Sequence, residues 1–195
     1  MIKAIVMLLA LIPSILLAAG PRWDHSIKID DPELTVEVAA QQCHKSLINA
    51  PELLEAWCEK AYEMGYWSAL VPISLHTGDG TRLVAEAKER LKNKEPKAYT
   101  VLAWLYGSGQ FVEEDIERAI SLNRELLNLA HAGVTPAIRT SAHKELADLY
   151  QLQENWPAVI KHASYVKKHS RFKFDIDAAQ RQIAKAQKHT QPSTQ

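Results

Sequence analysis

The feature of this sequence that most constrains its fold is a nine-residue pattern that occurs twice. Residues 98–106 and residues 142–150 both read A-x3-L-A-x-L-Y, and the two copies start 44 residues apart. Within each copy the first alanine and the two leucines recur at intervals of three and four residues, which places them on one face of an α-helix. Repetition at a period of about 20–50 residues is typical of arrays of stacked helix pairs. The pattern therefore predicts a helical repeat protein.

Length and composition agree with an all-α domain. The 195 residues are enough to bury a core, and the seven glycines and 7% of aromatic residues are few for a β-protein with many turns. The 23 basic and 23 acidic side chains balance each other. A balanced charge does not favour nucleic acid as a partner, and none is expected.

Helical patterns with proline or glycine at their ends divide most of the sequence into predicted helices. Pro96 suits the first turn of a helix, and Gly65 suits the residue that follows a helix end. The predicted helices span residues 33–48, 52–64, 68–77, 81–93, 96–107, 113–131, 136–152, 156–169 and 174–189. Asp31 is predicted to cap the first of them, before Pro32. Pro72 falls inside the third pattern and is expected to kink or restart that helix.

The first 19 residues have the layout of a secretory signal peptide. Lys3 supplies a short basic region, residues 4–19 form an apolar run, and the small residues at its end suit a signal peptidase. We expect cleavage after Ala19 or Gly20, which leaves a leader segment over residues 20–31 and places the protein in the periplasm or outside the cell. The alternative is an inner-membrane anchor through residues 4–19, although a comfortable span needs ~20 apolar residues. Both interpretations predict export.

The two cysteines are placed where a helical hairpin could bring them together. Cys43 lies eight residues before Pro51 and Cys58 seven residues after it, with helical patterns on both sides. In an antiparallel hairpin that turns at Pro51, the two side chains should therefore face each other. A disulfide closing this loop would contribute ~3 kcal/mol on the chain-entropy model. Two packed, reduced thiols are the alternative, and a zinc site is poorly supported because the paired ligand spacings of zinc sites are missing.

A longer motif follows the first copy of the repeated pattern. Residues 106–119 read Y-x2-G-x2-V-x2-D-x3-A, and residues 57–65 read W-C-E-K-A-Y-E-M-G. These segments resemble parts of a Sel1-like repeat, a relative of the tetratricopeptide repeat with a longer loop between its two helices. Phe111 stands where the family has a second loop glycine, and Thr77 where it has a tyrosine. The resemblance implies a right-handed α-α superhelix (a solenoid) of about four helix pairs plus a C-terminal helix, over residues 32–189, with residues 190–195 as a disordered tail.

No catalytic or nucleotide-binding motif is visible in the sequence. The G-x-S-x-G, H-E-x-x-H and phosphate-loop patterns are missing, and the eight histidines lack the spacing of metal ligands. His143 and His162 are expected to be surface or packing residues. We therefore expect neither enzymatic activity nor a metal or cofactor.

The concave face is where a helical solenoid normally binds its partner, and the first helix of each pair lines this face. If the resemblance holds, the protein is a scaffold that binds a protein or peptide there, in envelope assembly or secretion. The groove-facing positions on the two repeated helices are Lys97, Thr100, Trp104, Ser141, Lys144, Asp148 and Gln151. Trp104 is the strongest candidate because tryptophan is enriched among binding hot spots. The alternative for Trp104 is burial against the next repeat.

Charge is unevenly distributed along the sequence. The residues from Trp156 to the end carry eight lysines and arginines and two aspartates, whereas residues 20–155 carry 14 basic and 21 acidic groups. A solvated basic helix face is the simplest explanation of this excess. The alternative is contact between the basic C-terminal helix and an acidic glycan or lipid, which would make the protein an envelope-surface component.

Overall fold

The computed structural model describes residues 23–190, which contain α-helices, two short 3₁₀ helices and no strand. The α-helices are α1 (Val36–Asn49), α2 (Leu54–Glu63), α3 (Leu70–Thr77), α4 (Thr81–Lys92), α5 (Pro96–Ser108), α6 (Ile116–Asn128), α7 (Pro136–Leu152), α8 (Trp156–His169) and α9 (Lys173–Thr190). The 3₁₀ helices η1 (Pro51–Leu53) and η2 (Trp67–Ala69) precede α2 and α3. The predicted all-α class is confirmed. The predicted signal peptide at residues 1–19 and residues 191–195 of the predicted tail lie outside the described residues.

The start of α1 differs from the prediction. The helix begins at Val36 rather than at residue 33, and its N-cap is Thr35, whose hydroxyl accepts a hydrogen bond from the Val38 backbone N–H at 3.4 Å. Asp31 instead accepts a hydrogen bond from the Glu33 N–H at 2.9 Å, which closes a local turn. Both residues are able to cap a helix, and the sequence pattern does not show which of them does so.

Pro72 sits in the first turn of α3, where the missing N–H costs no hydrogen bond. The predicted restart takes the form of the 3₁₀ helix η2, which ends at Ala69 directly before α3 begins. Gly78 then ends α3 in the left-handed conformation, with φ at 76°.

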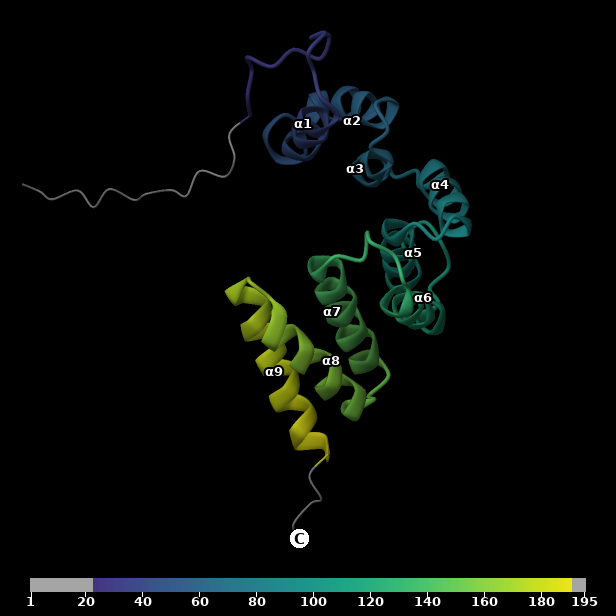
Figure 1. Cartoon of the computed structure of the whole chain (residues 1–195), viewed down its shortest axis with the longest axis vertical. Coiled ribbons are helices and arrows are strands. Elements are labelled where there is room, and N and C mark those ends of the chain that lie inside the picture. Colours follow the sequence, from purple (N-terminus) through teal and green to yellow (C-terminus); the bar gives the residue numbers. More distant parts are fainter. Residues whose placement is uncertain (1–22, 191–195) are drawn as a thin grey trace, which may run out of the picture.

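The helices follow one another along an arc (Figure 1). Each packs chiefly against the helix before it and the helix after it. In the figure α1, α3, α5 and α7 lie toward the inside of the bend, and α2, α4 and α6 lie toward the outside. The last helix, α9, packs along α8. No helix within residues 23–190 combines the length and the apolar character needed to cross a membrane.

Small residues of the repeated pattern lie in the core. Ala98, Ala103, Ala142 and Ala147 are at most 1% exposed. Their small side chains let neighbouring helices approach closely, and the leucines of the pattern fill the space between them. Burying one leucine contributes about 1.5–3 kcal/mol. The alanines and leucines of the repeated pattern therefore hold the helices together.

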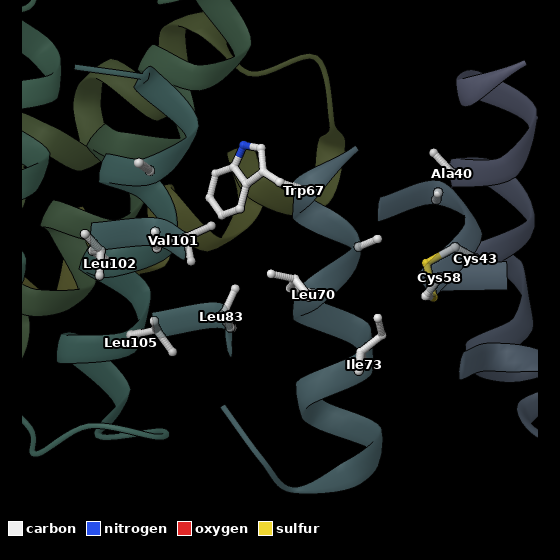
Figure 2. Packing of buried hydrophobic residues seen from close by; sticks show 14 of the residues in the cluster. Ala40, Cys43, Cys58, Trp67, Leu70, Ile73, Leu83, Val101, Leu102 and Leu105 are labelled. Carbon is white, nitrogen blue, oxygen red and sulfur yellow. A yellow bond between two sulfur atoms is a disulfide. The ribbon is translucent and has the colours of Figure 1, made fainter. Parts of the chain in front are cut away.

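The main core cluster runs through the first half of the arc. Figure 2 shows Leu70 and Ile73 of α3 between the cysteine pair on one side and Leu102 of α5 on the other. Cys43 and Cys58 form a disulfide with a Cα–Cα distance of 4.6 Å, and both residues are fully buried. The predicted bridge between α1 and α2 is therefore present, and the alternative of two reduced thiols is not the state that the structure describes.

The loop between α5 and α6 explains one departure from the Sel1-like pattern. Gly109 ends α5 with φ at 66°, and Phe111 is also left-handed, with φ at 63°. Phe111 thus keeps the backbone conformation that glycine adopts most easily. Its ring packs so closely against Gly80 that a Cβ there would overlap the Phe111 Cγ. The loop closes with a 2.9 Å hydrogen bond from the Asp115 N–H to the Tyr106 carbonyl, and Asp115 caps α6.

Candidate functional site

The predicted binding positions on α5 lie beside its buried face. Lys97 is exposed, and the protein atoms around its ammonium group lower its pKa by desolvation. The Thr100 hydroxyl donates a 2.8 Å hydrogen bond to the Lys97 carbonyl. Trp104 is half-buried, with one part packed against the main core. Trp104 is therefore partly packed in the core and partly accessible, and its role in binding stays a prediction.

A cavity of about 410 Å³ opens at the start of α5. It is lined by Gly65, Tyr66, Trp67, Ser68, Glu95 and Lys97. The indole N–H of Trp67 donates a 2.5 Å hydrogen bond to Glu95, and Arg90 pairs with the other oxygen of the same carboxylate at 2.8 Å. The guanidinium of Arg90 also lies over the Trp67 ring, 5.2 Å from its centroid. These contacts hold one wall of the cavity in place.

His44 of α1 reaches the same region, which the sequence did not predict. Its Nε2 lies 2.9 Å from the Tyr66 hydroxyl, and the two rings meet edge to face. Burial lowers the pKa of His44, and the positive charge of Lys97 lowers it further. Residue 44 lies in α1, residue 66 in the connection between α2 and α3, and residue 97 in α5. Their proximity is a product of tertiary packing, and no spacing in the sequence signals it.

The predicted positions on α7 have a different environment, because two of them form contacts with α9. Lys144 forms an ion pair with Asp175 of α9 at 2.6 Å. Asp148 accepts a 2.6 Å hydrogen bond from Gln182 of α9. Ser141 is exposed and Gln151 is half-buried. The structure thus places Lys144 and Asp148 against a helix of the same molecule, while Lys97 borders the open cavity.

The cavity at α5 offers groups for recognition. Its lining includes two residues with a hydroxyl group (Tyr66 and Ser68), the Trp67 ring, the Lys97 ammonium group and the Glu95 carboxylate. Such a mixture suits a peptide that carries an apolar side chain and a hydrogen-bonding or acidic group. Within residues 23–190, no group of three or more histidine, cysteine, aspartate or glutamate side chains is placed to hold a metal ion.

Comparison with known proteins adds no relative, since no protein-family model, no curated protein and no solved structure matches this sequence.

Proposed function

We propose that this protein is an exported, non-enzymatic repeat scaffold that binds a protein or peptide on the inner face of its helical arc. The resemblance of residues 57–65 and 106–119 to Sel1-like repeats supports a right-handed superhelix with a concave binding face. The signal-peptide layout of residues 1–19 supports a periplasmic location, in envelope assembly or secretion.

The observation that carries this proposal is the division of roles on α5. Ala98, Leu102 and Ala103 are at most 1% exposed and serve the core, whereas Lys97 and Trp104 reach the surface of the same helix. The cavity of about 410 Å³ lies beside Lys97. A helix that is buried through its repeated residues and presents its other residues beside a cavity is the arrangement by which repeat proteins bind.

The ammonium group of Lys97 indicates the chemistry of the partner. Lys97 takes part in none of the ion pairs that the structure describes among residues 23–190. Burying its ammonium group further would require a compensating charge. A carboxylate, from an acidic residue or the C-terminus of a peptide, is the natural complement. Trp67 and Tyr66 would contact the apolar part of the same peptide.

Site-specific photocrosslinking tests this function. A photoreactive benzoylphenylalanine in place of Thr100, one of the predicted groove positions on α5, should give a discrete adduct in the native host. The same group in place of Glu89, which is exposed on α4 toward the outside, is the matched control. Trp104→Ala should abolish the adduct while leaving the helical circular-dichroism signal intact. Equal adducts from positions 89 and 100, or a full adduct in the Trp104→Ala variant, would rule the inner face out.

A second candidate function, contact with an anionic surface, is favoured by the turn between α8 and α9. Phe172 and Phe174 are 71% and 73% exposed, and they alternate with the cations Arg171 and Lys173. Exposed aromatic rings among basic side chains suit the interface of an anionic bilayer better than a glycan, because the rings can enter the lipid headgroup region.

Vesicle binding tests this second candidate. The protein should bind vesicles that contain phosphatidylglycerol, and binding should weaken steeply as salt is added. The double variant Phe172→Ala/Phe174→Ala should lose most of the binding, whereas Leu152→Ala, at a site 67% exposed on α7, should not. Equal binding to vesicles of pure phosphatidylcholine would contradict a surface attraction based on charge.

A further inference from the structure

A second cavity, on a different side of the molecule, lies between α6, α7 and α8. Its volume is about 500 Å³. It is lined by Arg124, Leu127, Asn128, His143, Tyr150, Ala158, Lys161 and His162. Four of these eight residues carry or can acquire a positive charge, and none of the eight is acidic.

A pair of histidines forms part of the cavity wall. The Nδ1 atoms of His143 and His162 lie 2.9 Å apart, so the N–H of one ring donates a hydrogen bond to the other. His162 is only 7% exposed. The Tyr165 ring stacks on His143 with centroids 3.8 Å apart, and the Tyr150 ring lies along His162 at 5.6 Å. The sequence predicts two separate surface or packing residues here, and the structure joins them into one fixed unit.

This pair is held neutral by its surroundings. Burial lowers the pKa of each histidine to about 4, and neighbouring positive charges add to the effect. Those charges are Arg124 from α6, Arg139 from α7, and Lys161 and His169 from α8. The cations thus approach from all three helices that form the cavity.

The acidic groups that line the adjoining hollow are already engaged. Glu117 and Glu125 of α6 line the adjoining hollow. Glu117 accepts a hydrogen bond from Gln153, and Glu125 is contacted by Arg118 at 3.4 Å and by the Ser121 hydroxyl at 2.9 Å. These contacts leave the cations of the second cavity without a carboxylate of their own.

Of the seven arginines among residues 23–190, three form an ion pair, and four, Arg124 among them, do not. Arg82, Arg90 and Arg118 each form an ion pair with a glutamate. Among the ion pairs of residues 23–190, none involves Arg124 or Lys161. An accumulation of unpaired positive charge around a cavity raises the local concentration of anions.

The same charges argue against a metal ion. Two imidazole nitrogens that bind one zinc ion at ~2.0–2.1 Å stand roughly 3 Å apart, so the spacing of the pair alone would allow it. A cation placed between the rings would, however, be repelled by Arg124, Arg139 and Lys161. No acidic group among the lining residues would offset that repulsion.

We propose that this cavity binds the tetrahedral oxyanion of a small sulfate ester or phosphate monoester, and that the His143–His162 pair takes up a proton when the anion binds. Arg124 and Lys161 hold the oxyanion through charged hydrogen bonds. Leu127, Ala158 and the ring of Tyr150 contact the organic part. The site lies apart from the α5 cavity, so its existence is independent of the function proposed above.

Titration calorimetry at low ionic strength tests the site with three probes: phenyl sulfate, phenyl phosphate and inorganic sulfate. We expect saturable binding with one site per protein molecule, and tighter binding of the phenyl esters than of inorganic sulfate. The relative affinities of the sulfate and phosphate esters identify which oxyanion the site prefers. Failure of all three probes to saturate would overturn the proposal.

Charge-matched variants separate a site from a general attraction of anions. Arg124→Gln/Lys161→Gln removes two exposed cations at the cavity, and Arg181→Gln/Lys188→Gln removes two exposed cations on α9. The first double variant should weaken phenyl sulfate binding by about 100-fold or more, because each charged hydrogen bond is worth about 1.5–3 kcal/mol. The second should change it less than threefold. Equal losses in the two variants would mean that the cavity has no special role.

The proton uptake has a test of its own. Sulfate esters keep one charge between pH 5.5 and 7.5, so a pH dependence of their binding reports on the protein. If the bound anion restores a pKa near the ordinary value of ~6.5, affinity should rise about tenfold from pH 7.5 to pH 5.5. Calorimetry in two buffers with different ionisation enthalpies should show a net uptake of protons. His143→Gln should bind without this pH dependence, and a wild-type affinity that is flat with pH would contradict the role of the pair.

Discussion

The ring of Phe111 occupies the space that a side chain at position 80 would need. A Cβ on Gly80 would overlap three atoms of Phe111, and the left-handed backbone of Phe111 limits how far its ring can move. We expect Gly80→Ala to lower the free energy of unfolding by about 1–3 kcal/mol through overpacking. Urea unfolding measures the loss.

A double-mutant cycle isolates this contact. In the background of Phe111→Gly both the ring and the Cβ of residue 111 are absent, so adding Gly80→Ala should cost much less than it does in the wild type. Additive losses in the double variant would show that the overlap is relieved elsewhere in the loop.

Glu145 is the second residue whose environment makes a specific prediction. Burial raises the pKa of this carboxyl to about 7, the hydrogen bond from Asn123 opposes that rise, and the charge of Asp148 adds to it. The fully buried Oδ1 of Asn123 has no hydrogen-bond partner in the structure.

The sign of the resulting pH dependence follows from the two pKa values. The folded protein holds the Glu145 proton more tightly than the unfolded state, in which the pKa is 4.5. The stabilisation is complete below pH 4.5, is lost as the pH rises from 4.5 to about 7, and does not change above that. We expect Glu145→Gln to gain about 1–3 kcal/mol relative to the wild type between pH 4.5 and pH 7.5.

Urea unfolding of both proteins at several pH values provides this measurement. His143 and His162 have lowered pKa values, so they produce the opposite slope, with stability lost as the pH falls below 6.5. Both proteins contain these histidines, so the difference between their free energies of unfolding does not include the contribution of the histidines. A difference that is constant with pH would contradict the raised pKa of Glu145.

At the scale of elements, the α1–α2 hairpin is fastened by the only disulfide of the described residues. Cys43 and Cys58 are 15 residues apart, and a loop of that length is stabilised by ~3 kcal/mol when it is closed. Cys43→Ala/Cys58→Ala should therefore melt about 6–12 °C lower than the oxidised wild type. Wild-type protein melted in the presence of a reductant is the matched control and should shift in the same direction. Equal melting temperatures for all three samples would mean that the bridge does not form.

Element boundaries with a local chemical cause could be read from the sequence. Pro96 and Pro136 begin α5 and α7 as predicted, because proline in the first turn forgoes a hydrogen bond that no helix makes there. The start of α1 could not be read, because Asp31 and Thr35 are both competent caps and tertiary packing selects between them. The hydrogen-bonded pair of His143 and His162 joins two helices across a tertiary contact, and no periodicity encodes such a pair.

For the molecule as a whole, the repeated alanines and leucines were enough to predict the all-α class and the core, since small residues at helical spacing have few other uses. Only part of the candidate site could be predicted from the sequence. Lys97 and Trp104 follow from the repeat pattern, but the contribution of His44 from α1 depends on how three units stack. Likewise, the ion pair between Lys144 and Asp175 could not be predicted without knowing where α9 packs. Contacts between distant units depend on the curvature of the array, which single-helix patterns do not contain.

The pairing of each helix with its sequence neighbours also determines how the arc responds to force. With few contacts between non-consecutive helices, a pull on α1 reaches α9 mainly through successive interfaces, as through springs connected in series. In such a series the softest spring takes up most of the extension. Of the interfaces between consecutive α-helices, that between α3 and α4 is the sparsest, at the connection that carries Gly78 and Gly80 (Figure 1). We expect the arc to bend most easily at this connection.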